Sequence, residues 1–184
     1  MLALWIQKQN NQIMFNNKET LAIAKCITHN ETHICGFFCD YRWLSNFYPC
    51  PIVMEGIEYA SVEHAYQAMK WLPEFLDASK LNAMTPNKVK DAWKTVPKHQ
   101  LVPEHTWLEI RTFKMWNCLI QKYTTPVNHK LKTKLLATGT KHLEETNYWG
   151  DTFWGTDQKH KGSNILGILT MALRKQLLSS KTTF

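Results

Sequence analysis

The chain has 184 residues, 44% of them hydrophobic and 20% charged, so it can bury the core of one domain and is too apolar to be disordered. Lys and Arg outnumber Asp and Glu by 22 to 15, and this formal charge of +7 favours a polyanionic partner, with a solubilising surface as the alternative. The sequence opens without a basic start and a long apolar run, and no apolar run approaches the ~20 residues of a membrane span, so we expect a cytoplasmic protein with neither a signal peptide nor a membrane helix.

The sequence divides into an N-terminal stretch and one domain. Residues 1–33 are polar and rich in Asn and Gln, and we expect them to be an extension packed on a domain of residues 34–184. Within that domain, Ile34 to Phe38 has the composition of a buried strand. Glu55-Gly56 separates two short apolar runs, which is a hairpin signal.

Helices account for most of the remaining sequence. Thr85-Pro86 and Thr125-Pro126 each join a capping residue to a proline at the first helical position. A short strand is expected over residues 141–145. The expected helix starts are Ser61, Glu74, Pro86, Pro103, Pro126 and Ser163, and Gly139 is typical of the residue after a helix end. The expected fold is therefore mainly α, a helix-rich α+β domain with a small antiparallel β element near the N-terminus.

The helix that starts at Ser61 carries an informative set of polar residues. Ser61 is a suitable N-cap, and Glu63 places a carboxylate in the first turn, where the helix dipole favours it. Glu63, Gln67 and Lys70 follow at i, i+4 and i+7, so a carboxylate, an amide and an amine share one face. The alternative is an ordinary solvated face, because such patterns are common on exposed helices.

A second group of candidates lies in the loop of residues 147–162, which is dense in Trp, Gly and Asp. Trp149-Gly150 and Trp154-Gly155 each combine a stacking ring with a backbone that a ligand can approach closely. Gly162-Ser163-Asn164 then opens a helix whose free N–H groups could hold a phosphate. Aromatic loops with glycine also cap hydrophobic cores, so this pattern leaves both interpretations open.

The cysteine and charge patterns bear on cofactors and partners. Five cysteines without a CxxC pair indicate reduced thiols. Cys35 and Cys39 are four apart, but no second Cys/His pair at zinc spacing follows, so we expect neither a metal site nor a cofactor. Between residues 86 and 134, ten Lys and Arg stand against three acids, so this segment carries the whole positive excess.

Four motifs occur in order along the chain: Ser45-Asn46-Phe47, then Ser61-x-Glu63-His64-x-x-Gln67-Ala68-x-Lys70, then Leu143-x-Glu145-x-Asn147-x-Trp149-Gly150-Asp151-x-Phe153-Trp154-Gly155, then Gly162-x-Asn164-x-Leu166-Gly167-x-Leu169-x-Met171-x-x-Arg174. They resemble the NADAR, or YbiA-like, family from about Ile34 to Leu177. The resemblance implies a helix-rich YbiA-like fold and an N-glycosidase that releases a phosphorylated ribose or ADP-ribose from nitrogen. Two substrate classes are implied: early riboflavin-pathway intermediates, and guanine bases of nucleic acid that carry ADP-ribose.

Both substrate classes contain a nitrogen bonded to C1 of a ribose. Its cleavage needs a proton and a group that traps the electrophilic carbon. Glu63 is the candidate general acid or base, and Glu145 is a second carboxylate. A desolvated Lys70 can attack the ring-opened imine and form a Schiff base, which water then cleaves. The alternative is direct attack by water, with Lys70 binding phosphate or orienting Glu63.

Other candidates are expected to bind the ligand. Asn46, Gln67 and Asn147 are expected to hold ribose hydroxyls, and Trp149 and Trp154 to stack on adenine or on the leaving base. The further ligand-binding candidates are Phe47, Gly150, Asp151 and Asn164, and the candidates for phosphate or nucleic acid are Arg42, Lys114, Lys130, Lys132 and Lys134. His64 as a structural hydrogen-bonder, Asp151 as a loop cap and Arg174 as a buried ion-pair partner are the simpler interpretations of those three side chains.

The localised charge favours nucleic acid, because a modified base in a strand needs a groove that tolerates phosphates. We therefore expect a monomeric ADP-ribosyl glycohydrolase that removes ADP-ribose from guanine bases and reverses toxin-type ADP-ribosylation of DNA. The first alternative is an N-glycosidase of phosphorylated riboflavin-biosynthesis intermediates, which need no extended basic surface. The second is a non-catalytic ADP-ribose-binding module. The joint presence of Glu63 and Lys70 favours an enzyme over a binding module. A macrodomain-like reader would also show a parallel α/β sequence pattern, which this sequence lacks.

Overall fold

The structure, a computed structural model, describes residues 17–180. The described chain divides into two compact units, of which the first contains the residues up to Ser45 together with Thr140–Ala172. The second contains Asn46–Gly139 and the chain from Leu173 onward. Much of the expected N-terminal extension lies outside the described residues, and its boundary at residue 33 stays a prediction.

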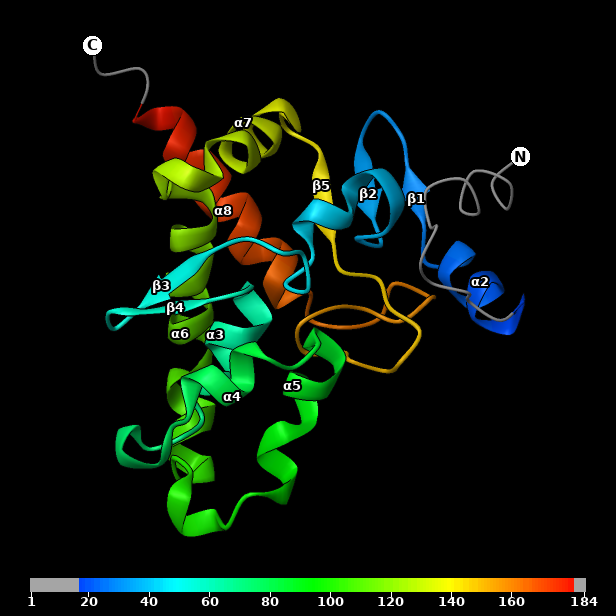
Figure 1. The fold of residues 1–184 in the computed structure, drawn as a ribbon. Helices are drawn as coiled ribbons and strands as arrows, with labels where there is room; N and C mark the ends of the chain where they lie inside the picture. Colours follow the sequence, from blue (N-terminus) through cyan, green and yellow to red (C-terminus); the bar gives the residue numbers. More distant parts are fainter. Residues whose placement is uncertain (1–16, 181–184) are drawn as a thin grey trace. The chain divides into compact units, whose positions relative to one another are not determined.

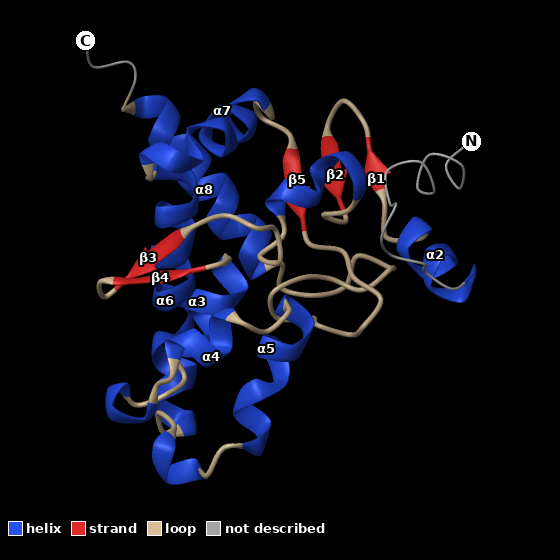
Figure 2. Cartoon of the chain, in the orientation of Figure 1, coloured by secondary structure: helices blue, strands red, loops and turns tan. Residues whose placement is uncertain are grey.

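The first unit is built on a sheet of three short strands, shown in red in Figure 2. The sheet has the order β1-β2-β5, with β1 antiparallel to β2 and β2 parallel to β5. Around it, the described residues of this unit form one helix, one 3₁₀ turn and the start of the last helix. The elements are α2 (Asn17–Ala24), β1 (Thr28–His29), β2 (His33–Cys35), η1 (Cys39–Leu44), β5 (His142–Glu144) and α8 (Ile165–Ser179), of which Ile165–Ala172 belong to this unit.

The second unit is mainly helical and contains one hairpin. Its strands are β3 (Ile52–Met54) and β4 (Ile57–Tyr59), and its helices are α3 (Val62–Ala68), α4 (Ala78–Asn82), α5 (Pro86–Ala92), α6 (Glu104–Thr124) and α7 (His129–Ala137). Short 3₁₀ turns occur at Pro73–Phe75, Trp93–Thr95, Lys98–Gln100 and Pro126–Asn128. Helix α3 packs against α4, α5, α6 and the hairpin (Figure 1), so its side chains are surrounded by protein.

The helix-rich α+β expectation is confirmed, and several element boundaries follow the local signals. The hairpin turns at Glu55-Gly56, and Gly139 follows α7 with φ of +58°. The helix expected from Glu74 begins later, at Ala78, because the Asp77 side chain accepts a hydrogen bond from the Lys80 amide and caps it there. Within residues 17–180, none of the helices has both the length and the apolar character needed to cross a membrane.

The parallel pairing of β2 with β5 was not expected. The sequence indicated only an antiparallel element, because strands this short leave no local trace of the distant strand they pair with. One parallel pair joins segments more than 100 residues apart, with Cys35 opposite Glu144 and Ile34 opposite Leu143. Ile34 and Leu143 are both fully buried, so one face of this pair lies in the core.

Candidate active site

Helix α3 is buried along its whole length. Ser61 caps it with extended backbone angles, and its hydroxyl accepts a hydrogen bond from the His64 amide, as expected. Glu63 and Gln67 are only 6% and 5% exposed, so the face that carries them is not a solvated one. A carboxylate and an amide withdrawn from water are costly unless they have polar partners, so their burial needs an explanation.

The buried polar side chains of α3 contact one another and Asn46. The Gln67 Nε2 donates to Glu63 Oε1 at 2.9 Å, and the Glu63 amide donates to the Asn46 carbonyl at 3.0 Å. Among the described residues, Asn46 Oδ1 and Gln67 Oε1 are buried acceptors that have no hydrogen-bond partner. Acceptors left in this state in a folded protein are suited to donors from a ligand, such as sugar hydroxyls.

Lys70 lies two residues beyond the end of α3, between two indole rings. Its Nζ is 4.4 Å from the ring centroid of Trp93 and 5.7 Å from that of Trp107. Desolvation lowers the Lys70 pKa from 10.5 to about 8, although the Glu63 carboxylate acts in the opposite direction. About one amine in ten is then neutral near pH 7, which gives Lys70 the character of a nucleophile. We call Asn46, Glu63, Gln67 and Lys70 the α3 cluster.

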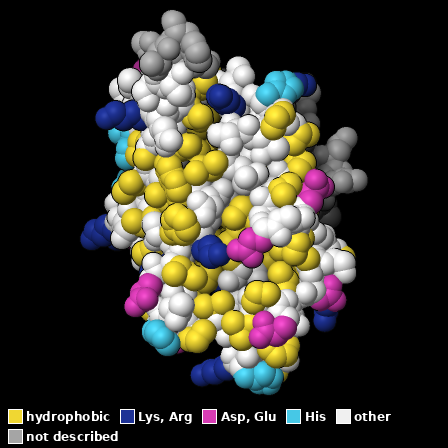
Figure 3. Space-filling model, turned by 90° about the vertical axis from the view of Figure 1, so that its left-hand side faces the viewer, with side chains coloured by type: hydrophobic (Ala, Val, Ile, Leu, Met, Phe, Trp, Pro, Cys, Tyr) yellow, Lys and Arg dark blue, Asp and Glu magenta, His cyan; other side chains and the backbone are white. Residues whose placement is uncertain are grey.

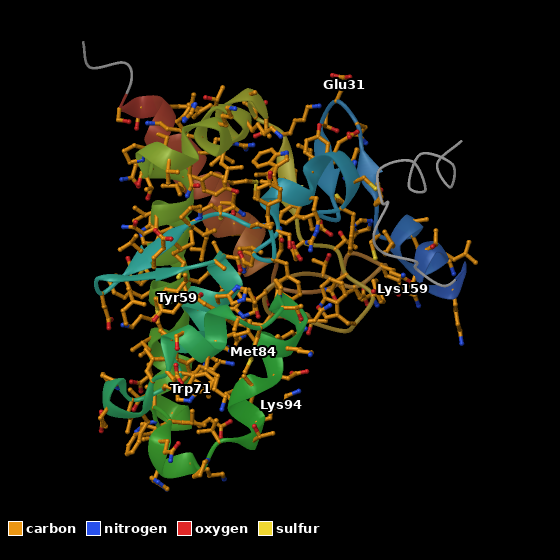
Figure 4. All side chains as sticks on the ribbon, in the orientation of Figure 1. Glu31, Tyr59, Trp71, Met84, Lys94 and Lys159 are labelled. Carbon is orange, nitrogen blue, oxygen red and sulfur yellow. The ribbon has the colours of Figure 1, made fainter. Side chains whose placement is uncertain are left out.

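His64 has the structural role expected of it. Its Nδ1 and the Ser61 Oγ are 2.8 Å apart, and its Nε2 donates to the Met84 carbonyl at 3.0 Å, near the position labelled Met84 in Figure 4. Both ring nitrogens are therefore engaged, and the ring ties the start of α3 to the turn after α4. Phe47, the neighbour of Asn46, is half-buried.

The two tryptophans beside Lys70 were not predicted. Trp93 follows α5 and Trp107 lies in the first turn of α6, so only the tertiary fold brings them to Lys70. The high count of eight Trp in the sequence was the available signal. Trp107 also contacts the buried Tyr66 ring, with centroids 5.1 Å apart, which fixes this wall of the Lys70 environment.

In the first unit, Glu145 and Arg42 are brought together. Desolvation lowers the pKa of the Arg42 guanidinium, and the Glu145 carboxylate opposes that shift. Glu145 follows directly after β5, and its amide donates to Asn164 Oδ1 at 3.1 Å. The Glu145 carboxylate therefore acts electrostatically on Arg42, and Glu145 lies just before the loop of residues 147–162, which we call the Trp loop.

Several polar side chains of this region hold the backbone of the Trp loop. Asn147 Nδ2 donates to the carbonyls of Asp151 and Thr156, and its Oδ1 accepts from the Asp151 amide. Asp151 Oδ1 accepts from the amides of Phe153 and Trp154, so it caps the loop. Gly150 turns the chain with φ of +82°. The geometry thus gives Asn147 and Asp151 a shaping role, and contact with a ligand stays a prediction for both.

The prediction that free N–H groups at the start of the last helix could hold a phosphate is wrong. Helix α8 begins at Ile165, and Asn164 rather than Ser163 precedes it, with its carbonyl accepting from the Ile168 amide. The amides of Asn164, Ile165 and Leu166 donate to carbonyls of the Trp loop, at 3.0–3.2 Å. The Asn164 side chain also binds backbone, because its Nδ2 donates to the Leu143 carbonyl. The Trp loop therefore occupies the N–H groups that a phosphate would need.

The two predicted stacking residues differ in access. Trp149 is 45% exposed and meets Phe38 edge-on, with ring centroids 6.3 Å apart. Trp154 is half-buried and meets Phe153 edge-on at 4.9 Å. An exposed indole can offer its face to a base, so Trp149 is the better placed of the two.

The basic excess of residues 86–134 is smaller at the surface than in the sequence. Lys122 is fully buried, Lys114 pairs with Glu55 at 3.1 Å and Lys94 pairs with Asp91 at 2.6 Å. On α7, Lys130 and Lys134 are exposed and Lys132 is half-buried. The face drawn in Figure 3 shows hydrophobic side chains with charges of both signs dispersed among them. Arg174, expected in an ion pair, is buried and donates to the Thr138 hydroxyl.

The comparisons with known proteins agree with these motifs. The chain is 34% identical over 140 residues to the riboflavin biosynthesis protein VVA0006 of Vibrio vulnificus (strain YJ016), but it spans only 36% of that protein's length. It is 31% identical over 150 residues to the N-glycosidase YbiA of Escherichia coli (strain K12), covering 77% of this chain and 85% of YbiA. The N-glycosidase Npun_R5314 of Nostoc punctiforme is 31% identical over 141 residues, covering 74% of this chain and 86% of that protein.

The solved structures give the same result for the fold. The NMR structure of E. coli YbiA has a TM-score of 0.69 and 27% identity, and the match covers 89% of this chain and 95% of that one. The relatives' names bear out the expected enzyme class, a hydrolase of N-glycosyl bonds. The NADAR domain model matches residues 36–178, which is most of the sequence. This match and the relatives above show that the chain belongs to the NADAR domain family.

Proposed function

We propose that this protein is an N-glycosidase that removes ADP-ribose from guanine bases of nucleic acid and so reverses toxin-type ADP-ribosylation of DNA. The observation that carries the proposal is the α3 cluster. It contains an amine with a pKa of about 8, a buried carboxylate, and two buried oxygen atoms that accept no hydrogen bond from the described residues. A binding module would have no need for a desolvated amine, whereas a nucleophilic mechanism requires one.

The chemistry can be written for these residues. Glu63 gives a proton to the ring oxygen of the ribose, the ring opens, and C1 becomes a protonated imine to the guanine nitrogen. The neutral amine of Lys70 attacks C1, one of its protons passes to the guanine nitrogen, and guanine leaves with its amino group restored, so that Lys70 holds C1 as a protonated Schiff base. Water then adds to C1, the bond to Lys70 breaks and a proton returns to Glu63, which restores both residues and releases ADP-ribose.

The other candidates have supporting roles in this proposal. Asn46 Oδ1 and Gln67 Oε1 would accept hydrogen bonds from ribose hydroxyls, which would satisfy both buried oxygens. Glu145 is the proposed second carboxylate, Arg42 a phosphate contact, and Trp149 a stacking face. The cytoplasm is the proposed site of action, supported by five free cysteines.

A second candidate function is hydrolysis of a phosphorylated riboflavin-pathway intermediate. The name of the Vibrio relative favours it, and so does the loss of surface charge through the burial of Lys122 and the pairing of Lys114. Such a metabolite has the same C1–nitrogen bond and needs no extended basic groove. The same α3 cluster would serve both substrates, so the substrate has to be tested directly.

The test compares the two substrates with matched variants. Purified protein is incubated with an oligonucleotide carrying ADP-ribose on guanine or with the riboflavin-pathway intermediate, and loss of the sugar is followed by mass spectrometry. We expect turnover of the oligonucleotide, abolished in Lys70→Ala and Glu63→Gln but kept in the control variants Lys175→Ala and Glu58→Gln, whose residues are exposed. Turnover of the intermediate alone would replace the first candidate with the second, and turnover of neither would leave a non-catalytic ADP-ribose reader.

A further inference from the structure

The parallel pair in the first unit places metal-ligating side chains on one face. Its strands read His33-Ile34-Cys35 and His142-Leu143-Glu144, with each residue opposite the one at the same place in the other strand. Side chains alternate along a strand, and the fully buried Ile34 and Leu143 occupy one face. The two histidines, the cysteine and the glutamate therefore share the other face.

A third histidine reaches this face from the Trp loop. His160 Nδ1 lies 2.7 Å from Glu144 Oε1, and one ligand atom each from Cys35, Glu144 and His160 lie within 4.8 Å of one another. His142 Nε2 is 3.3 Å from the other oxygen of Glu144. Its ring also lies 5.3 Å from that of His33, centroid to centroid. Sulfur, nitrogen and carboxylate oxygen thus converge from three separate segments.

The carboxylate at the centre of this group is held in place. The hydroxyls of Thr146 and Thr156 both donate to Glu144 Oε1. Hydrogen bonds of this kind fix the orientation of a ligand carboxylate in metal sites. The His160 backbone is held by a turn, because its amide donates to the Asp157 carbonyl at 2.9 Å. Cys35 and Glu144 are buried, whereas His160 is exposed, so one of the three ligands is open to solvent.

We propose that Cys35, Glu144 and His160 form a zinc-binding site, with His142 as the fourth ligand. This donor set of sulfur, two imidazoles and a carboxylate is one that Zn²⁺ takes in tetrahedral geometry. His142 is placed by its contact with the second Glu144 oxygen, from which its ring has to turn toward the ion. The ligand atoms of Cys35, Glu144 and His160 lie within 4.8 Å of one another and must draw closer, because ligand atoms of a tetrahedral zinc lie about 3.5 Å apart. The exposed His160 can supply that movement. Zinc displaces the thiol proton of Cys35 and replaces the hydrogen bond between His160 and Glu144.

The site would connect the sheet to the Trp loop. Cys35 belongs to β2, Glu144 and His142 to β5, and His160 to the loop. A metal bound there would stabilise the loop that carries Trp149 and would act next to Glu145 without taking part in the reaction. The proposal is independent of the proposed function, since it concerns residues outside the α3 cluster. The sequence predicted no metal site because no Cys and His pairs at zinc spacing lie close together in it, whereas the proposed ligands come from distant segments that strand pairing brings together.

Metal binding to the full chain tests the proposal. The protein is stripped with a chelator, then titrated with Co²⁺ and with Zn²⁺. We expect one Co²⁺ per chain, with the near-ultraviolet absorption of a cobalt–thiolate bond and the visible bands of tetrahedral cobalt. Cys35→Ser should abolish the thiolate absorption, and the control Cys39→Ser should keep it. Zn²⁺ should displace the cobalt and raise the melting temperature of the wild type by several degrees.

A second variant keeps the test decisive if Cys35→Ser does not fold. His160→Asn changes an exposed side chain at a position with φ of +59°, which Asn tolerates. We expect it to melt like the stripped wild type and to bind Zn²⁺ at least about tenfold more weakly. Equal zinc affinity in His160→Asn and wild type would overturn the proposal. Cobalt spectra without a thiolate band in the wild type, or no stoichiometric binding, would do the same.

Discussion

Replacing Lys70 with arginine separates the two roles considered for this side chain. Arginine keeps a positive charge next to Glu63 at every accessible pH, but it cannot act as an amine nucleophile. If Lys70 forms a Schiff base, Lys70→Arg should lose at least about 10³-fold in kcat and change KM only a few-fold. If Lys70 only binds phosphate or orients Glu63, the variant should keep much of its activity.

The fraction of Lys70 that is a neutral amine in the wild type follows from the surroundings of its side chain. Desolvation dominates and lowers the Lys70 pKa to about 8; Glu63 and Asp91 raise it, and Lys94 and Lys90 lower it. Compared with the ordinary 10.5, this difference of about 2.5 units makes the neutral amine roughly 300-fold more abundant near pH 7. The rate should therefore rise about tenfold per pH unit below about pH 8 and level off above it, because the neutral form reacts.

The assay is the initial rate of sugar release between about pH 6 and about pH 9.5, measured by mass spectrometry for wild type, Lys70→Arg and the control Lys175→Arg. The control residue lies exposed on α8 and should leave the profile unchanged. Activity of Lys70→Arg above about a tenth of wild type would refute a nucleophilic lysine. A wild-type rate that does not change between about pH 6 and about pH 8 would refute the lowered pKa as the controlling quantity.

Three other variants, the last of them a double substitution, test separate parts of the structure. Lys70→Met should raise the free energy of unfolding near pH 7 by about 1–2 kcal/mol, because a lowering of about 2.5 pKa units corresponds to roughly 3 kcal/mol before it is discounted for partial exposure. This gain should fade between about pH 8 and about pH 10.5, where Lys70 becomes neutral in the folded wild type, and a gain that stays constant over that range in urea unfolding would contradict it. Gly155→Ala would place a methyl group against the Glu145 carbonyl and should cost at least about 2 kcal/mol in unfolding free energy, so an unchanged melting temperature would show that the loop can yield there. Lys130→Glu with Lys134→Glu should reduce activity on an oligonucleotide by about tenfold or more and spare a free ADP-ribosylated nucleoside, whereas equal losses on both would exclude α7 as a nucleic-acid contact.

The sequence correctly predicted the parts of the fold that depend only on residues close together in the chain, such as helix caps and tight turns. Ser61 caps α3 through its own hydroxyl, and Pro86 starts α5 at the first helical position. Glu55-Gly56 turns the hairpin with φ of +53° and +79°, values that a tight turn demands. Each of these outcomes depends on neighbouring residues, so the local signal was sufficient.

The failures have a common physical origin in contacts between distant segments. Lys122 was counted in the basic excess of residues 86–134, yet it is fully buried on α6. The amides at the start of α8 looked available in the sequence, but the Trp loop folds back and uses them. Trp93 and Trp107 reach Lys70 only through the packing of α3 against α5 and α6. Sequence spacing carries no information on such contacts, so the face of α3 could be predicted but its surroundings could not.

The central claim is that C1 of the ribose passes through a covalent bond to Lys70. Cyanoborohydride reduces a Schiff base to a stable secondary amine, so turnover in its presence should leave the sugar on the protein. The account predicts that peptide mass spectrometry finds the added ADP-ribose on the peptide containing Lys70, and that Lys70→Arg carries none. Turnover of the substrate without an adduct, or with the adduct on a different lysine, would contradict it.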